Sequence, residues 1–473
     1  MERRFSGRRA VAVTAGKAVS VASRRLGRGG GTTAPGIVAE RLRSSVAREL
    51  AAQLSSGCLL VSGTNGKTTS ARILASILTA EGHTVIRNET GANLPRGVAA
   101  SLVESATVRG NLPAGRRSVG LFEVDEAALP TLLETLRPRG VLLLNLFRDQ
   151  LDRYGEVATV ARLWRQALQR FPPENPVLIN GDDPLLVDTL EGDLRPPVCF
   201  GIDSADRSRA GPEHAGDVKA CPRCGDSIRY DAVFLAHLGH YRCASCGFGR
   251  PDCQVRALDV QLLGLAGSSF VLVTPDGEAH VALPLPGMYN VYNALAAAAA
   301  AWQSGVRIAR IASAVSAASP AFGRMERIQI DDRPVVLALT KNPAGLNEVV
   351  RTALQGNSGL HLLVILNDNA ADGFDVSWIW DADIEMLAGA VRTVVFSGTR
   401  AADIALRFKY AGALPADGRT SWRVEEDIGE ALASAVSLTP NGENLIVMPT
   451  YTALLEVRRT MAALGYVKPF WES

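Results

Sequence analysis

A glycine-rich turn between an apolar run and a helical stretch is the feature that most restricts the fold of this chain. Residues 59–78 are LLVSGTNGKTTSARILASIL, a strand pattern, then G-x-x-G-K-T-T, then apolar residues at helical spacing. In a parallel sheet such a turn directs backbone N–H groups and the positive end of a helix dipole toward an anion. The order of elements therefore predicts a phosphate-binding loop. Its residues are Gly63, Thr64, Asn65, Gly66, Lys67, Thr68 and Thr69.

The match to the phosphate-loop signature is partial. The full eight-residue pattern begins with glycine, and Val61 stands at that place. In such loops the lysine, here Lys67, reaches the β- and γ-phosphates, and the hydroxyl of the next residue, here Thr68, binds Mg²⁺. The alternative is an ordinary glycine turn with a surface lysine.

Short β-rich runs alternate with helical stretches along most of the chain. This alternation predicts an α/β fold with largely parallel, doubly wound sheets, in which ligands bind at the carboxyl ends of the strands. The expected strands are CLLVSG, HTVIRN, SVGLFEVD, GVLLLNLF and PVLINGDD in a first domain, and PVVLAL, HLLVILND, TVVFSG and NLIVMP in a second.

Composition and spacing divide the 473 residues into three parts. Residues 1–50 are an Arg-rich segment, for which we expect a basic helix and a glycine-rich linker, with a transit peptide as the alternative. We expect residues 51–320 to form the domain that carries the phosphate-binding loop, interrupted at 201–257 by a polar, cysteine-containing insertion, and residues 321–473 to form a second, smaller α/β domain. The alanine-rich run near Ala294 is expected to be a packed core helix.

Charge and hydropathy argue against two classes of protein. The net charge is only +2, and a general nucleic-acid binder would need a larger basic excess. No apolar window is long enough to predict a membrane span. We therefore expect a cytoplasmic protein, although the basic N-terminal helix could lie on the anionic inner face of the membrane.

Acidic residues follow several of the expected strands. Mg²⁺ on a nucleotide takes a few carboxylates or hydroxyls, with water completing the shell. Any single acid could instead cap a helix, but as a set they favour a metal–phosphate site. They are Glu123, Asp149, Asp152, Asp182 and Asp183.

Four of the seven cysteines form two C-x-x-C pairs separated by eighteen residues. This spacing predicts a zinc ribbon in which Cys221, Cys224, Cys243 and Cys246 close a tetrahedral, structural Zn²⁺ site. Disulfides or an iron–sulfur centre are the alternatives. The three scattered cysteines are expected to be buried thiols. His237 and His240 lie between the pairs; we expect them not to bind the metal, with substitution for a cysteine ligand as the alternative. Because the ribbon interrupts the phosphate-loop domain, we expect it to stabilise the insertion rather than to bind nucleic acid.

The motifs SGTNGKTT, FEVDE, NLFRDQLDRYGE, NGDDP and PGMYNVYNALAA occur in the order seen in Mur ligases and folylpolyglutamate synthases, and the chain resembles these enzymes. They activate a carboxylate with ATP to an acyl phosphate that an amine then attacks. The resemblance implies that Lys67 and Thr68 hold phosphates and Mg²⁺ and that Glu123 is a metal ligand. It also implies that Asn290 contacts adenine and that Arg324 meets the phosphates from the last domain.

Two departures from the Mur ligase pattern are visible. No lysine occurs between Lys67 and Lys219, whereas most Mur ligases carry a carbamylated lysine there, and Gln150 stands where several relatives have a metal-binding histidine. About 50 residues precede the first strand, too few for the usual UDP-sugar domain. The substrate is therefore not expected to be the cytoplasmic nucleotide precursor held in the usual way.

From about Ala51 onward the chain resembles one subgroup of these ligases, the MurT family. The features that carry this are LTKNPAGLNEV, the cysteine insertion, the short N-terminus and the acidic loop LNDNAADGFDVSWIWDADIE. The resemblance implies amidation of the α-carboxylate of D-glutamate in the lipid II stem peptide to D-isoglutamine, with ammonia from a GatD-like glutaminase partner. It also implies that Asp375, in DVSW, completes the glutaminase's Cys-His triad across the interface, with Asp368 and Asp372 as alternative candidates for this role.

Two rival functions remain at this point. One is an amino-acid ligase of the folylpolyglutamate type, which the insertion and the DVSW motif disfavour. The other is a nucleotide-switched zinc-ribbon module that binds nucleic acid, which the balanced charge disfavours. For the acidic loop itself, the alternative is a structural loop packed down by Trp378 and Trp380.

Overall fold

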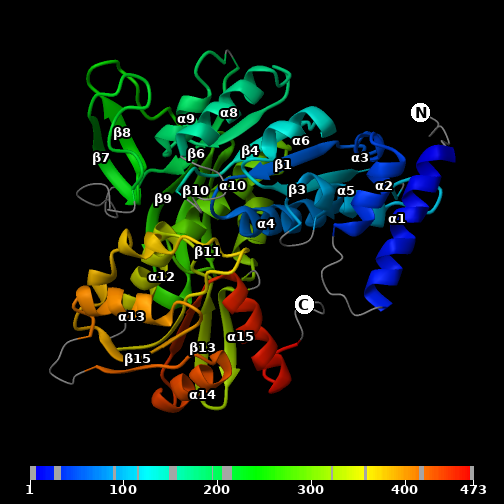
Figure 1. The fold of residues 1–473 in the computed structure, drawn as a ribbon. Coiled ribbons are helices and arrows are strands. Elements are labelled where there is room, and N and C mark those ends of the chain that lie inside the picture. Colours follow the sequence, from blue (N-terminus) through cyan, green and yellow to red (C-terminus); the bar gives the residue numbers. More distant parts are fainter. Residues whose placement is uncertain are drawn as a thin grey trace.

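The computed structural model describes residues 7–25, 33–88, 92–113, 117–148, 157–193, 195–204, 216–320, 323–355, 359–414 and 420–468. Two α/β units make up most of this part of the chain. The first is built on a nine-stranded sheet and the second on a six-stranded sheet. Figure 1 shows the second unit, in yellow to red, beneath the first.

The nine-stranded sheet has the order β11-β10-β9-β6-β5-β4-β1-β3-β2. From β2 to β9 neighbouring strands run parallel, and β9, β10 and β11 pair antiparallel at one edge. The strands are β1 (Cys58–Ser62), β2 (Thr84–Arg87), β3 (Ser118–Val124), β4 (Gly140–Leu143), β5 (Val177–Asn180), β6 (Val198–Ile202), β9 (Val255–Leu262), β10 (Ser268–Thr274) and β11 (Gly277–Leu283).

Helices cover both faces of this sheet, which explains why its central strands are almost continuously apolar. One face packs on α4 (Lys67–Ala80), α10 (Met288–Gln303) and α11 (Ile308–Ser316). The other face packs on α3 (Val46–Ala51), α5 (Pro95–Ser105), α6 (Leu129–Leu136), α8 (Val157–Gln169) and α9 (Pro184–Thr189). The alanine-rich run lies in α10 and is buried along its length, so the expectation of a core helix is confirmed.

The N-terminal helix α1 (Gly7–Arg25) packs with α2 (Ala34–Leu42) against α5. Ala12 and Val13 of α1 are fully buried, whereas Val11 and Val21 on its other side are exposed. Within the described part of the chain, no helix has both the length and the apolar composition needed to cross a bilayer.

The second unit contains the sheet β12-β13-β17-β14-β15-β16, in which only the β12–β13 pair is antiparallel. Helices α12 and α13 lie on one face and α14 and α15 on the other. The elements are β12 (Arg324–Ile330), β13 (Arg333–Ala338), α12 (Pro343–Leu354), β14 (Leu360–Ile365), β15 (Val391–Ser397), α13 (Ala401–Tyr410), β16 (Ser421–Val424), α14 (Ile428–Leu438), β17 (Leu445–Pro449) and α15 (Tyr451–Ala463), with short 3-10 helices at Ser377–Trp380 and Ile384–Leu387. A further 3-10 helix, Gly264–Ala266, lies between β9 and β10 of the first unit.

The cysteine-rich insertion leaves the first sheet after β6 and returns at β9. It contains an antiparallel hairpin formed by β7 (Ile228–Leu235) and β8 (Leu238–Cys243). The observed architecture is the predicted α/β fold with parallel sheets and a second α/β unit.

Candidate active site

The predicted phosphate loop joins β1 to α4. Gly63 and Gly66 have φ values of 144° and 88°, in the region that favours glycine, so the chain can turn sharply here. A Cβ atom on Gly66 would lie 2.0 Å from Oδ1 of Asn293 on α10, so this glycine is required by close packing as well as by its backbone angles. The turn leaves the N-terminus of α4, with its partial positive charge, facing the loop.

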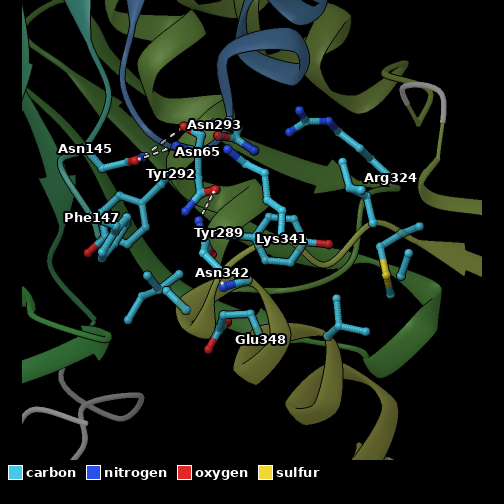
Figure 2. A pocket seen from close by; sticks show the side chains of 18 of the residues that line it. Asn65, Asn145, Phe147, Tyr289, Tyr292, Asn293, Arg324, Lys341, Asn342 and Glu348 are labelled. Carbon is cyan, nitrogen blue, oxygen red and sulfur yellow. Dashed lines mark hydrogen bonds between the residues drawn. The ribbon is translucent and has the colours of Figure 1, made fainter. Parts of the chain in front are cut away.

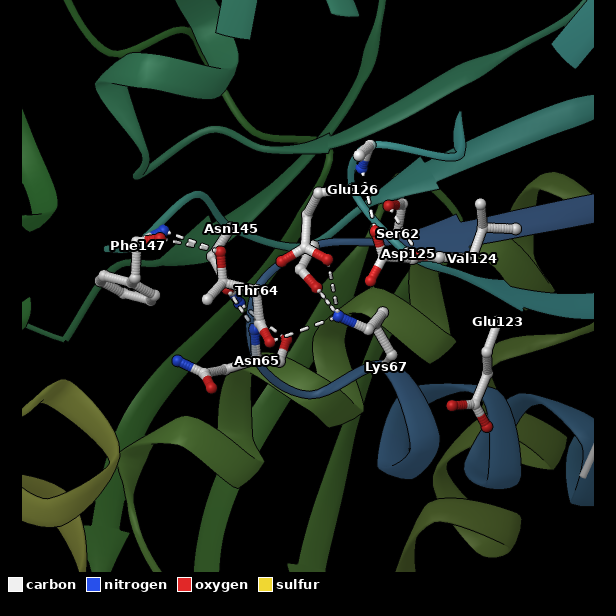
Figure 3. A network of polar contacts seen from close by, with 12 residues as sticks. Ser62, Thr64, Asn65, Lys67, Glu123, Val124, Asp125, Glu126, Asn145 and Phe147 are labelled. Atoms are coloured by element: carbon white, nitrogen blue, oxygen red, sulfur yellow. Dashed lines mark hydrogen bonds and ion pairs between the residues drawn. The ribbon is translucent and has the colours of Figure 1, made fainter. Parts of the chain in front are cut away.

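The Lys67 ammonium group folds back over the loop (Figure 3). Its Nζ donates to the carbonyl oxygen of Gly63, lies 3.4 Å from that of Thr64, and pairs with Oε2 of Glu126 at 3.1 Å. Burial by itself raises the pKa of Glu126, but the positive charges of Lys67 and Lys341 lower it below its ordinary value. Lys67 is therefore paired with a carboxylate at the place where a phosphate would otherwise neutralise it.

Thr68 and Glu123 lie next to this loop. The Thr68 hydroxyl donates to Oε2 of Glu123 at 2.8 Å, and the Glu123 backbone is held by two hydrogen bonds to Asn88. Burial raises the pKa of Glu123, although Arg324 and Lys67 act in the opposite direction. A buried carboxylate beside a hydroxyl is a donor set that suits Mg²⁺, so these residues fit the ion that the sequence predicts.

A ladder of asparagines supports the other side of the loop. Asn145 accepts from the Asn65 N–H at 2.8 Å and donates to the Asn65 carbonyl oxygen at 3.1 Å. The Asn293 amide donates to Asn290 at 3.0 Å, and the Asn290 amide donates to the carbonyl oxygen of Pro286 at 2.8 Å. Asn293 therefore faces the loop, whereas Asn290 lies behind it and fixes its orientation.

A pocket opens beside Asn65 and Gly66, between the two sheets, and residues of both α/β units line it. Figure 2 shows Phe147 and Tyr292 together on one side of the pocket and Arg324 on the opposite side. The first unit also contributes Tyr289, Asn293, Asn145, Leu235 and Leu238, and the second unit contributes Met325, Ala338, Leu339, Lys341, Asn342, Ala344, Gly345, Glu348 and Val349.

Direct contacts hold the two units together at this pocket. The Asn342 amide donates to Oδ1 of Asn65 at 3.1 Å, and Arg148 pairs with Asp381 of the second unit at 3.2 Å. The loop and the residues from the second sheet therefore form one polar surface.

Not all the predicted acids belong to this surface. Asp182 is fully buried and accepts hydrogen bonds from Arg250, Ile202 and Tyr292, and Asp183 caps α9 through the N–H groups of Leu185 and Leu186. The expectation that this pair joins a metal–phosphate site is wrong, because both carboxylates are already satisfied elsewhere. Asp149, Gln150 and Asp152 lie outside the described residues.

The four paired cysteines come together although they are far apart in sequence. All four Sγ atoms lie within 4.8 Å of one another, and two pairs are separated by 3.5 and 3.6 Å. A tetrahedral Zn²⁺ with bonds of about 2.3 Å would space its sulfurs by about 3.8 Å, so the cluster fits this ion. No disulfide forms among the seven cysteines, and the three scattered ones are buried as expected. Neither His237 nor His240 belongs to the cluster.

The acidic loop after β14 presents its carboxylates in different ways. Asp372 is buried and accepts hydrogen bonds from Thr452, and Asp368 accepts from Thr399 at 2.7 Å. Asp375 is exposed, and hydrogen bonds from Ser377 lower its pKa. The loop is not packed down by both tryptophans, because Trp380 is 51% exposed and lies against Tyr410.

Several residues at the pocket escaped the sequence analysis. Glu126 stands inside the quoted FEVDE motif, Asn293 is three residues after Asn290, and Lys341 lies in LTKNPAGLNEV, so each was within reach of a motif. Leu235 and Leu238 carried no comparable pattern. They reach the pocket only because the insertion folds back over the first sheet.

Comparisons with known proteins match two parts of the chain to known families. Residues 61–220 match the model of the Mur ligase middle domain, and residues 339–454 match that of the MurT ligase C-terminal domain. The lipid II isoglutaminyl synthase (glutamine-hydrolyzing) subunit MurT of Streptococcus pneumoniae is 30% identical over 96% of this chain and 97% of its own length.

Solved structures with low identity share the fold. MurF from Acinetobacter baumannii superposes with a TM-score of 0.65 at 19% identity, covering 91% of this chain and 80% of that one. MurF ligase from Thermotoga maritima, solved in complex with ADP, has a TM-score of 0.60 at 14% identity, covering 89% and 83%. Given the identity to the S. pneumoniae subunit over nearly the whole length, the chain belongs to the MurT family of Mur ligases.

Proposed function

We propose that this chain is the synthetase subunit of an ATP-dependent amidotransferase. Its substrate is the α-carboxylate of D-glutamate in the lipid II stem peptide, and its product is D-isoglutamine. The S. pneumoniae relative is a subunit of lipid II isoglutaminyl synthase, which supports lipid II as the substrate and an isoglutaminyl product. The observation that carries the proposal is the pocket itself, in which a phosphate loop on one sheet faces Arg324 and Lys341 on the other.

The reaction has two steps. One oxygen of the substrate carboxylate attacks the γ-phosphorus of ATP, the bond from that phosphorus to its bridging oxygen breaks, and ADP leaves. Ammonia then attacks the carbonyl carbon of the acyl phosphate. Its C–O bond to phosphate breaks, the nitrogen loses a proton, and inorganic phosphate departs with one oxygen that came from the substrate.

The residues around the loop supply positive charge where charge moves during phosphoryl transfer. Lys67 exchanges its contact with Glu126 for the phosphates, and Arg324 and Lys341 approach them from the second unit. Thr68 and Glu123 would hold Mg²⁺, which when bound neutralises charge on the β- and γ-phosphates. Asn290 acts on the nucleotide through Asn293, so we assign it a positioning role.

The nitrogen source is a separate glutaminase of the GatD type. Asp375 is the acid we assign to its Cys-His pair, because the Asp375 carboxylate is exposed, whereas that of Asp372 is buried against Thr452. A carboxylate that orients a histidine must reach its ring from the surface of this subunit. The subunit name of the relatives supports a complex of this kind.

We place the protein in the cytoplasm, with its N-terminal segment at the inner membrane surface. Residues 1–50 contain eleven Lys and Arg and three Glu, a net charge of +8 in a chain whose total is +2. This basic segment suits an anionic lipid surface, where the proposed substrate is anchored. Co-sedimentation with anionic and neutral vesicles tests this placement.

The test of the proposed function is amidation of lipid II by the purified complex. Wild-type protein should form the amide from ATP and either glutamine or free ammonia. Lys67→Ala should lose synthesis with both nitrogen sources because the phosphates lose their main cation, while Lys468→Ala, an exposed lysine in the second unit, should keep it. Near-normal turnover by Lys67→Ala with an unchanged fold would refute the phosphate assignment, and use of glutamate as the acceptor would favour the amino-acid ligase.

A further inference from the structure

The hairpin of β7 and β8 reaches from the four-cysteine cluster to the pocket. Ile228 pairs with Cys243 at one end of the hairpin, and Leu235 pairs with Leu238 at the other. The eight residues of β7, at about 3.3 Å each, span roughly 25 Å. Leu235 and Leu238 line the pocket beside Phe147, so one rigid element connects the four thiols with the pocket wall.

The tip of the hairpin is fixed to the wall on which it lies. The ring of His237, in the turn, is fully buried and packs on Phe147 with centroids 4.8 Å apart. Nδ1 of His237 accepts from the Asp217 N–H at 3.2 Å, and the Asp217 carboxylate in turn pairs with Arg148 at 2.9 Å. Phe147 and Arg148 lie in the segment after β4, which ends at Leu143, so the tip is held by a segment that helps form the pocket.

A second network holds the flank of the hairpin. His240 on β8 contacts Asp203 at 3.2 Å, and Arg250 bridges Asp203 at 2.9 Å and Asp182 at 2.5 Å. The hydroxyl of Tyr292 donates to Asp182 at 2.8 Å, and Tyr292 itself lines the pocket. This network is fully buried at Asp182 and partly exposed at His240 and Asp203, and its paired groups favour one orientation of the residues they join.

We propose that the four-cysteine hairpin is part of the nucleotide site, and that Leu235 and Leu238 form the apolar wall against which the base of ATP packs. This inference rests on the proposed use of ATP. Phe147, Tyr292 and the two leucines form an apolar wall that the first unit contributes, beside the apolar residues of the second unit. The backbone of Gly66 and the side chains of Arg324 and Lys341 suit phosphate. Zn²⁺ held by the four cysteines would fix the end of the hairpin that lies away from the pocket, and thereby the position of its tip.

The proposal separates the base from the phosphates, and this gives its test. Binding of ATP and of inorganic tripolyphosphate, which lacks a base, is measured by calorimetry on the full chain. A double variant, Leu235→Ala with Leu238→Ala, should weaken ATP binding at least about tenfold, because shortened side chains leave the base without apolar contact. The affinity for tripolyphosphate should stay within about twofold of the wild-type value, because tripolyphosphate has no base to contact the leucines. Arg229→Ala, on the exposed side of β7, is the matched control and should change neither.

Removal of the metal provides a second test of the proposal. Protein stripped with a chelator should lose ATP affinity about tenfold and regain it when Zn²⁺ is added back, with tripolyphosphate binding retained. The leucine variants keep all four cysteines, so they carry the test if the stripped protein unfolds. Unchanged ATP affinity in the double leucine variant would overturn the inference while leaving the proposed function intact. Failure of wild-type protein to bind ATP at all would overturn both.

Discussion

Replacement of Gly66 by alanine tests how the phosphate loop is built, and Gly82→Ala is its matched control. The two glycines flank the same helix, α4, and have similar backbone angles, with φ of 88° and 81°. A Cβ atom on Gly82 meets nothing within 4 Å, whereas one on Gly66 would lie 2.0 Å from Oδ1 of Asn293. The two substitutions therefore share the backbone cost and differ only in the clash.

The difference in free energy can be worked out from these contacts. Alanine at a left-handed position costs about 1–2 kcal/mol at either site. At Gly66 the Asn293 side chain must also turn away and lose its hydrogen bonds with Ser70, at 3.4 Å, and with Asn290, at 3.0 Å. At about 1 kcal/mol each, these add roughly 2 kcal/mol to the destabilisation by Gly66→Ala.

Thermal unfolding and nucleotide binding report this difference separately. A further 2 kcal/mol should lower the melting temperature of Gly66→Ala by about 4–8 °C relative to Gly82→Ala. If the Gly66→Ala variant must spend the same amount, about 2 kcal/mol, to restore the loop conformation that binds ATP, its affinity for ATP should be about thirtyfold lower than that of Gly82→Ala. Equal melting temperatures and ATP affinities within twofold of each other would show that the packing of Gly66 on Asn293 does not shape the site.

Two further predictions concern single carboxylates. Asp375→Asn should cripple glutamine-dependent amidation in the complex but spare amidation driven by added ammonia, because its carboxylate serves only the partner's histidine; equal loss with both nitrogen sources would argue against this role. Glu123→Gln should melt above the wild type near pH 8 in Mg²⁺-free buffer, since burial raises the pKa of Glu123 and ionisation of this carboxyl therefore destabilises the folded state. The difference in melting temperature between the variant and the wild type should shrink as the pH falls toward 4.5, the ordinary pKa of a glutamate. Only the wild type should gain stability from Mg²⁺–ATP. A difference in melting temperature that is constant with pH would contradict the role assigned to the buried charge of Glu123.

The parts of the site that are local in sequence could be predicted from it. The strand, turn and helix around Lys67 have fixed spacing, so the loop was visible without any tertiary information. The same holds for the cysteine pairs, since each knuckle is a four-residue pattern and only their convergence required the fold. By contrast, the sequence does not show which carboxylates of the acidic loop are exposed, because this depends on how Asp372 packs against Thr452 of α15.

The parts that depend on distant packing were missed or misjudged. Asp182 and Asp183 follow a strand, as metal ligands often do, but the insertion supplies Arg250 as a buried partner for Asp182. The sequence of the insertion gives no sign of where the hairpin tip lies, so the contact of Leu235 and Leu238 with the pocket could not be predicted. The pairing of Lys67 with Glu126 was hidden for the same reason, since side-chain direction at a strand end is set by tertiary contacts.

The most direct test of the account follows oxygen from substrate to product. Lipid II labelled with ¹⁸O in both oxygens of the D-glutamate α-carboxylate is amidated by the complex with ATP and ammonia. Activation through an acyl phosphate predicts that each inorganic phosphate released carries one ¹⁸O atom and that the amide keeps the other. Label found in AMP, or phosphate released without label while the amide forms, would contradict the claim that the pocket between the two sheets transfers the γ-phosphoryl group to the carboxylate.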